Sequence, residues 1–303
     1  MLTTLALTLW LAATPEPPSV TIAAMGDVLV ARAVPQRLAA HGAAWFWEPI
    51  KEELSAADLR FCNLECPVTT VGQPVPKPFC FRAAPDDARA VLSAGGLDLV
   101  SLANNHTWDY RRPGLQATLD HVASFGLLGL GAGRGRSGAV AARRVVRHGL
   151  RIAFLAYTCW TPEMYQPSDR DAAIATLDEG LLAGELKAAK VGADALVVSV
   201  HWGAEYSDGI TDDQRRVGHE LVDAGADLVL GAHPHVAEPI ETYHGRPIVY
   251  SLGNAVFDRQ GRRVSNGLLV RARVSAGAAT VEKVTPLDIL DTRPVPAPAA
   301  EPD

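Results

Sequence analysis

Residues 227–236 read DLVLGAHPHV, a strand-like apolar run that ends in two histidines, His233 and His235. Four more apolar runs end in the same way, each at a polar residue: Val20 to Met25 before Asp27, Leu59 to Leu64 before Glu65, Leu97 to Ala103 before Asn105, and Ala195 to Val200 before His201. In an α/β sheet, ligands bind at the carboxyl ends of the strands. We therefore expect five strands to bring these polar side chains together at the same sheet edge.

The order of the remaining patterns indicates an α/β fold. Strand-like runs alternate with helical patterns, expected at Ala43–Ser55, Pro85–Ala94, Arg112–Phe125, Thr176–Lys190 and Asp212–Ala224. The second half is richer in strands, with hairpins expected around His148-Gly149 and His244-Gly245 and further strands at Leu268–Val274 and Thr280–Ile289. There is no internal repeat, so residues 19–291 are expected to form one α/β domain with two packed sheets.

Length and composition are those of a globular protein. The chain has 303 residues, 48% of them hydrophobic and 20% charged. These values are ordinary for a folded domain. The net charge of −6 argues against a nucleic-acid partner, which would require a basic surface.

The two ends of the chain have distinctive compositions. Residues 1–13, MLTTLALTLWLAA, resemble the apolar region of a secretory signal, although no Lys or Arg precedes it. We expect residues 1–18 to be a signal peptide and linker, and the protein to be exported to the periplasm, cell envelope or medium. Residues 292–303 are rich in Pro and Ala and are expected to be a disordered tail.

The cysteines leave two interpretations open. There are four, Cys62, Cys66, Cys80 and Cys159, with no C-x-x-C spacing. In an exported protein they could form up to two disulfides, with Cys66 and Cys80 closing the loop between them. Buried, unpaired thiols are an equally good interpretation.

The polar residues at the strand ends suit a metal centre. Oxygen and imidazole donors without sulfur favour hard or borderline divalent ions, so we expect one or two ions of Mn, Mg, Zn or Fe. Two such ions activate water and neutralise substrate oxygens in phosphoester hydrolysis. Asp27 and Glu65 are the candidates for a bridging carboxylate, and Asn105 offers a carbonyl oxygen. The histidines His201, His233 and His235 offer neutral nitrogens.

His106 is expected to have a different role from these ligands. It directly follows Asn105, so its side chain is expected to point elsewhere and to act as a proton donor or oxyanion stabiliser.

These residues also carry a family resemblance, spread over residues 20–258. The shared motifs are Gly26-Asp27, Asn63-Leu64-Glu65, Leu102-Ala103-Asn104-Asn105-His106, Asp109-Tyr110, His201-Trp202-Gly203-Ala204-Glu205-Tyr206, Gly225-Ala226-Asp227, His233-Pro234-His235-Val236, Glu241 and Tyr250-Ser251-Leu252-Gly253-Asn254. In this order they resemble the bacterial capsule-synthesis protein CapA family of the calcineurin-like metallophosphoesterases. The resemblance implies a four-layer α/β/β/α sandwich of the metallo-dependent phosphatase type.

The resemblance also implies a role for each position. Glu65 would bridge two ions, and Asn105, His201 and His233 would complete one site. Asp27 and His235 would hold the other ion, and His106 would assist the leaving group. The chain departs from the wider superfamily at Leu29, where a further histidine ligand would stand.

Two functions are compatible with this resemblance. The first is an exported metal-dependent hydrolase linked to capsule or poly-γ-glutamate biosynthesis. The second is a non-catalytic or weakly catalytic envelope protein that supports polymer synthesis, export or anchoring beside membrane-associated machinery. For either, the expected ligand is an anionic polymer or a phosphorylated small molecule. The residues that we expect to contact it are Arg111, Trp202, Glu205, Tyr206 and Asn254.

Overall fold

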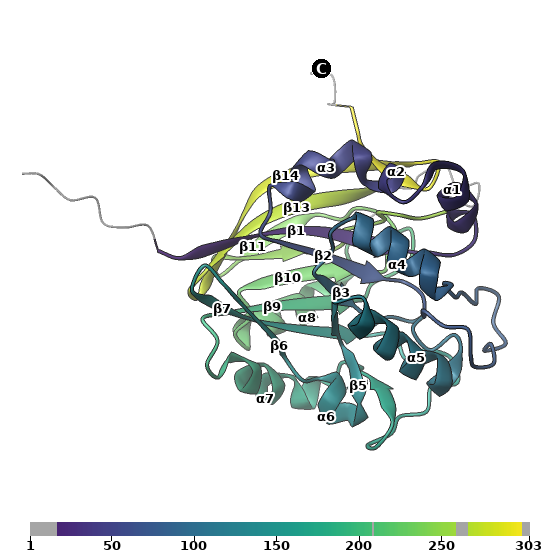
Figure 1. The fold of residues 1–303 in the computed structure, drawn as a ribbon. Coiled ribbons are helices and arrows are strands. Elements are labelled where there is room, and N and C mark those ends of the chain that lie inside the picture. The colour runs from purple at the N-terminus through teal and green to yellow at the C-terminus, as the bar shows by residue number, and fades with distance from the viewer. Residues whose placement is uncertain (1–16, 208, 259–265, 299–303) are drawn as a thin grey trace, which may run out of the picture.

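The computed structural model describes residues 17–207, 209–258 and 266–298. The larger of its two main sheets has seven strands (Figure 1). The strands follow the order β15 (Arg293–Pro296), β14 (Ala278–Leu290), β13 (Asn266–Ser275), β1 (Ser19–Val28), β2 (Leu59–Leu64), β3 (Leu99–Ser101) and β4 (Leu128–Leu130). Strands β1 to β4 are parallel, whereas β13, β14 and β15 extend the sheet in antiparallel fashion. The carboxyl ends of β1, β2 and β3 therefore lie at the same end of this sheet.

A second sheet has six strands, in the order β11 (Ile240–Tyr243), β12 (Arg246–Val249), β10 (Leu228–Ala232), β9 (Ala195–His201), β7 (Leu150–Thr158) and β6 (Arg143–Arg147). The four inner strands are parallel and the two edge strands are antiparallel. Both edge strands belong to the predicted hairpins. Their turns are His148-Gly149 and His244-Gly245, with all four φ angles positive (50°, 80°, 48° and 74°), as tight two-residue hairpins require.

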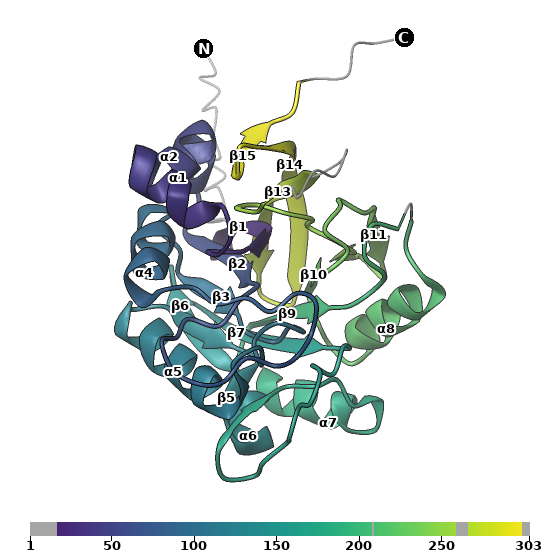
Figure 2. The same ribbon diagram turned by 90° about the vertical axis from the view of Figure 1, so that its right-hand side faces the viewer.

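Helices cover the outer faces of both sheets (Figure 2). The first sheet carries α1 (Val34–His41), α2 (Ala44–Trp47), α3 (Lys51–Ser55), α4 (Pro85–Ala94) and α5 (Arg111–Ser124), and the second carries α6 (Gly135–Ala139), α7 (Glu179–Lys190) and α8 (Asp212–Asp223). A small two-stranded sheet, β5 (Ala132–Arg134) with β8 (Ala172–Ile174), lies beside α6. The four-layer α/β/β/α sandwich predicted from the sequence is confirmed.

Strand β7 shows how the layers are held together. Its residues Ile152, Phe154 and Ala156 join the core that contains strands of both sheets. The alternate residues, Ala153, Leu155 and Tyr157, pack instead into the cluster beneath α7 and α8. This alternation follows from the two-residue period of a strand, and each large apolar side chain so buried contributes about 1.5–3 kcal/mol.

Several predicted elements need correction. The single helix expected at Ala43–Ser55 is divided into α2, a 3₁₀ turn at Glu48–Ile50, and α3. Pro49 accounts for the break, because a proline inside a helix removes a backbone donor. Helix α1 was not predicted; no side chain caps its first turn, so it lacks the usual start signal.

The predicted disordered tail at residues 292–303 is also partly wrong. Arg293–Pro296 form β15, which pairs with β14. Residues 299–303, and residues 1–16 of the signal and linker predicted at 1–18, lie outside the described residues. No helix within the described part of the chain is long and apolar enough to cross a bilayer. All four cysteines are free thiols; Cys62 and Cys66 are buried, as the interpretation of buried, unpaired thiols expects, whereas Cys80 is half-buried and Cys159 is exposed.

Candidate metal centre

The predicted ligands come from strand ends of both sheets. Asp27, Glu65 and Asn105 belong to or follow β1, β2 and β3 of the first sheet. His201 ends β9 and His233 follows β10, in the second sheet. The expectation of one shared sheet edge is therefore wrong in this respect: the two facing sheets each provide half of the cluster.

Four donor atoms converge around His201. Its Nε2 lies 3.0 Å from Asn105 Oδ1, 3.1 Å from His233 Nδ1 and 3.5 Å from Glu65 Oε1. The ligand atoms of Glu65, His201 and His233 all lie within 4.8 Å of one another. The structure thus brings together the four residues predicted to form one metal site.

Hydrogen bonding does not account for this convergence. A neutral imidazole has one N–H, so His201 Nε2 cannot serve three acceptors at once. Glu65 Oε1 is buried and has no hydrogen-bond partner among the described residues. A buried carboxylate oxygen without a partner is costly, and a divalent cation would satisfy it together with the nitrogen lone pairs. The donor set therefore fits a metal ion.

Burial sets the protonation of this cluster. Desolvation, followed by repulsion from Asp27, raises the pKa of Glu65 well above its usual range. Burial lowers the pKa of His201 well below its usual range and that of His233 to about 3, each helped by neighbouring histidines. Both imidazoles are therefore neutral at pH 7, the form that binds metal ions.

Asn63 links the two carboxylates. Its Nδ2 donates to Asp27 Oδ1 at 2.8 Å and also contacts Glu65 Oε2. Its own Oδ1 accepts from Asn104 Nδ2 at 3.1 Å. Sequence reasoning assigned no role to Asn63, although its position two residues before Glu65 on one strand places both on the same face.

The second predicted site has fewer free donors. His235 Nδ1 lies 3.0 Å from Asp27 Oδ2 and 3.1 Å from Asn254 Oδ1. Burial alone would lower the pKa of His235, but the bond to Asp27 and its charge raise it overall. Leu29, at the position of the missing histidine, is fully buried in the main core. Asp27 and His235 therefore form a hydrogen-bonded pair rather than an open ligand set.

His106 lies beside the cluster with its own partners. Its Nδ1 is 2.9 Å from Asp109 Oδ2, and Lys77 Nζ is 2.7 Å from Asp109 Oδ1. Burial lowers the pKa of His106, although Asp109 opposes the shift. His106, His235, Glu205 and Tyr206 line the same small cavity of about 30 Å³. The placement agrees with a residue that serves the cluster without ligating it.

Close backbone packing positions Asp27 and the histidines. A Cβ on Gly26 would lie 1.8 Å from Gly253 O, so only glycine permits this approach. Asp27 N donates to Gly253 O at 2.9 Å. His233 and His235 both have positive φ, 102° and 60°. Such backbone strain in non-glycine residues is a recurrent feature of functional sites.

The residues predicted to contact the substrate lie in different surroundings in the structure. Glu205 and Tyr206 line the His106 cavity. Asn254 is buried and engages His235, to whose carbonyl oxygen its Nδ2 donates at 3.0 Å. Arg111 contacts Met164 Sδ at 3.9 Å, away from that cavity.

Trp202, another residue expected to contact the ligand, lies in the protein core. It is buried, packs in the cluster beneath α8, and donates from Nε1 to Tyr250 O at 2.7 Å. Trp160, which sequence reasoning missed, is 46% exposed, with its ring centroid 5.3 Å from that of His233. Trp160 is therefore the better candidate for an aromatic side chain that contacts the ligand. No local sequence pattern marks it; it is recognised from its position near His233 in the structure.

Solved structures of other proteins share this fold. A hypothetical protein from Thermus thermophilus matches with a TM-score of 0.52 at 18% identity, covering 88% of this chain and 97% of that chain. The NAD nucleotidase of Haemophilus influenzae matches with a TM-score of 0.51 at 11% identity, covering 89% of this chain and 50% of that chain. A 5'-nucleotidase precursor from Thermus thermophilus matches with a TM-score of 0.51 at 13% identity, covering 92% of this chain and 54% of that chain. At these identities the likeness concerns the fold alone.

Sequence comparison identifies the family of this chain. Residues 21–259 match the model described as bacterial capsule synthesis protein PGA_cap. The PGA biosynthesis protein CapA of Bacillus subtilis is 32% identical over 90% of this chain and 72% of its own length. The capsule biosynthesis protein CapA of Bacillus anthracis is 29% identical over 94% of this chain and 71% of its own length. The chain belongs to the bacterial capsule synthesis protein family, as its motifs predicted.

Proposed function

We propose that this protein is a metal-dependent hydrolase with phosphoesterase-like chemistry, acting in the synthesis of a capsule or poly-γ-glutamate polymer. The observation that carries the proposal is the convergence of Glu65, Asn105, His201 and His233 on one point, with a buried carboxylate oxygen left unpaired among the described residues. Membership of a capsule synthesis family supports the biological setting.

Each residue of the site would have a separate role in hydrolysis. A divalent ion held by Glu65, Asn105, His201 and His233 would supply Lewis-acid activation of water and of the substrate oxygens. Asp109 accepts from His106 Nδ1 and so leaves Nε2 to exchange a proton with the leaving group. Lys77 compensates the buried charge of Asp109. Glu205 and Tyr206 would shape the entrance beside His106.

Metal analysis with turnover assays on the purified chain tests this proposal. We expect about one tightly held ion per chain, a weaker second ion at high added Mn²⁺, and hydrolysis of phosphoester substrates that depends on the ion. His201→Ala should remove the tight ion and the turnover. His121→Ala, on the outer helix α5, is the matched control and should retain both. A metal-free wild-type chain after saturation with Mn²⁺, Mg²⁺, Zn²⁺ and Fe²⁺ would refute the proposal.

A second function, metal-supported binding without efficient catalysis, is favoured by the Asp27–His235 pair. Asp27 and His235 are hydrogen-bonded to one another, and Leu29 provides no metal ligand. This alternative predicts that the tight ion is present while phosphoester turnover stays at background. Polymer synthesis machinery at the membrane would then be the partner.

Export is a further part of the proposal, supported by the apolar residues 1–13. The mature protein should begin near Thr14 and be recovered from the periplasm, envelope or medium. Amino-terminal sequencing of the protein from its native host checks this. An intact Met1 on protein in the cytoplasmic fraction would contradict it.

A further inference from the structure

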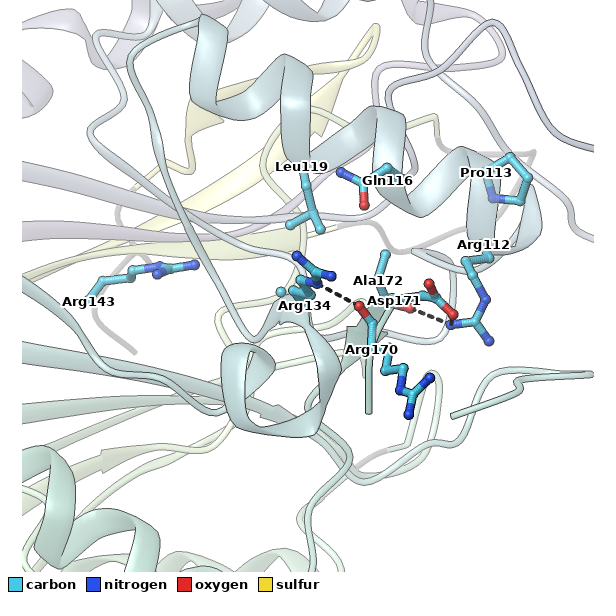
Figure 3. Close-up of a pocket in the computed structure, with 10 residues that line it drawn as sticks. Arg112, Pro113, Gln116, Leu119, Arg134, Arg143, Arg170, Asp171 and Ala172 are labelled. Atoms are coloured by element: carbon cyan, nitrogen blue, oxygen red, sulfur yellow. Dashed lines mark hydrogen bonds and ion pairs between the residues drawn. The ribbon is translucent and has the colours of Figure 1, made fainter. Parts of the chain in front are cut away.

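A second site candidate is a pocket of about 690 Å³ outside the metal centre, between the start of α5, the β5–β8 sheet and the start of β6. Four of its lining residues are arginines: Arg112, Arg134, Arg143 and Arg170. Figure 3 shows Arg143 at one end of the pocket, Arg112 at the other, and Arg134 and Arg170 between them. We call this set the arginine row.

Backbone carbonyls hold most of this row in place. Arg112 Nη1 donates to Ala172 O at 2.9 Å, Arg134 Nε to Arg170 O at 2.7 Å, and Arg143 Nε to Gly129 O at 3.0 Å. A carbonyl orients a guanidinium but does not neutralise its charge. Each guanidinium also has five N–H donors, so most remain available to a ligand.

Carboxylates do little to compensate the row. Asp171 is the acidic residue of the pocket, and its Oδ2 lies 3.9 Å from Arg112 Nη1 with 63% of the side chain exposed. An exposed pair at this distance contributes little. Within the described part of the chain, Arg134, Arg143 and Arg170 form no ion pair with a carboxylate. The row is therefore a concentration of positive charge on a protein whose net charge is −6.

The shape of the row distinguishes between anionic ligands. A single phosphate or carboxylate would meet one or two guanidinium groups, because Arg112 and Arg143 stand at opposite ends of the pocket. An extended chain with a carboxylate on each repeating unit would meet several in succession. Guanidinium and carboxylate match geometrically through paired N–H···O bonds.

We propose that the arginine row is a binding site for a segment of a polycarboxylate chain. The choice of carboxylate rests on the proposed function in anionic polymer synthesis, whereas the site itself rests on the row. Arg112 lies over the Trp108 ring at 5.4 Å, and Trp108 follows His106 by two residues. The segment 105–112 therefore connects the row to the metal centre along the chain.

Binding of a labelled short oligoglutamate to the full, metal-loaded chain at low salt tests the site. Replacing both central arginines, as Arg134→Gln with Arg170→Gln, should weaken binding about tenfold or more. The matched control, Arg144→Gln with Arg147→Gln, removes the same charge from β6 outside the pocket. Arg144 also donates to a carbonyl, Ala189 O at 3.1 Å. The control should change the affinity by less than about twofold. Equal weakening by both pairs, or none by either, would overturn the proposal.

Two further arms separate this site from the metal centre and from a simple anion site. His201→Ala should leave oligoglutamate affinity unchanged even though it removes the tight ion; a loss of binding there would place the polymer at the metal centre instead. Inorganic phosphate should compete only at concentrations far above the oligomer. Phosphate that competes as well as the oligomer would show a single-anion site and refute the chain-binding proposal.

Discussion

His106 and its partners show how individual side chains are prepared for a task. Asp109 accepts from His106 Nδ1 at 2.9 Å and from Phe81 N at 2.6 Å, and Lys77 approaches its other oxygen. These bonds fix the orientation of the imidazole and of its second nitrogen. Since Asn105 offers the donor atom nearest His201, we expect metal binding not to need His106.

The first prediction therefore separates ligand from proton donor. His106→Ala should keep the tight ion and reduce turnover by about 10²–10⁴-fold, the usual contribution of a positioned acid. Metal content and the rate constant kcat are measured on the same sample. Loss of the ion along with activity would show that His106 is a ligand.

The same residue gives the expected dependence on pH. A histidine acts as a general acid in its protonated form, and burial lowers the pKa of His106 below its ordinary value. Turnover that depends on its proton should fall as pH rises through this lowered pKa. His106→Ala should lack that limb of the pH profile, whereas His121→Ala should retain it.

At the residue scale, the sequence predicted the candidate metal ligands better than the residues that surround and orient them. His201, His233, Glu65 and Asn105 could be recognised because each ends an apolar run. Asn63 could not, because an asparagine inside a strand has many ordinary uses. Trp160 meets His233 only through the path of a loop, which no local pattern specifies.

Elements of the two sheets are joined at the end opposite the metal centre. Asp58 precedes β2 and accepts from Thr21 N and Thr21 Oγ1, both at 2.8 Å, while its Oδ1 lies 2.8 Å from His148 Nε2 in the β6–β7 turn. Burial opposes ionisation, but these bonds lower the pKa of Asp58 from 3.8 to about 2. One carboxylate thus links the first sheet to a hairpin of the second.

A second prediction follows for this link. A carboxylate whose pKa is lowered in the folded state stabilises it above the ordinary value of 3.8, and the contribution is lost as pH falls toward about 2. Asp58→Asn should lower the free energy of unfolding at pH 7 by about 1 kcal/mol, allowing for solvent screening. Denaturation at pH 7 and at a pH of about 2.5 should show a smaller difference at the lower pH. Asp169→Asn, in an exposed loop, is the control; a pH-independent cost for Asp58→Asn would contradict the linkage.

Helix α8 supplies a third prediction. Thr211 Oγ1 accepts from Gln214 N at 3.1 Å, and Gln214 Oε1 accepts from Thr211 N at 2.8 Å, which together form a reciprocal capping box. Thr211→Ala should therefore lower the free energy of unfolding by about 1 kcal/mol. Thr211→Ser keeps the oxygen and should retain most of the stability in the same denaturant titration. An equal loss in both variants would assign the effect to packing.

Long, strongly patterned elements were the most predictable. Helices α4 and α8 carry clear start signals, and their predicted bounds agree with the structure to within one residue. The short strands β4, β5 and β8 have three residues each, too few for a period to be recognised. The proline-rich composition of β15 is typical of a disordered tail, but pairing with β14 overrides composition.

Across the whole molecule, the metal cluster lies where the two sheets meet. Glu65 and Asn105 belong to one sheet and His201 and His233 to the other, so an ion bound to all four would fasten the halves together. A ligand that binds only the folded state adds about 2.7 kcal/mol at a hundredfold excess over its dissociation constant. We predict that added Mn²⁺ raises the Tm, by roughly 2–4 °C per kcal/mol for a domain of about this size.

Calorimetry with and without a chelator checks this fourth prediction. His201→Ala should unfold at the same temperature in both conditions, since its ion is lost. The wild-type chain should show the shift, and His121→Ala should follow it. An unchanged wild-type Tm with Mn²⁺ in excess would mean that the four donors do not share one ion.

The proline-rich strand β15 has a consequence for solubility. It closes one edge of the seven-stranded sheet, with Pro294 opposite Ile289 and Pro296 opposite Leu287. Proline has no N–H, so this outer edge is a poor template for a strand from another molecule. Without β15, the long strand β14 would present its backbone and the half-exposed Leu290 to neighbouring chains. The short Arg-Pro-Val-Pro segment thus disfavours edge-to-edge pairing with another molecule, and we expect its removal to promote self-association through β14.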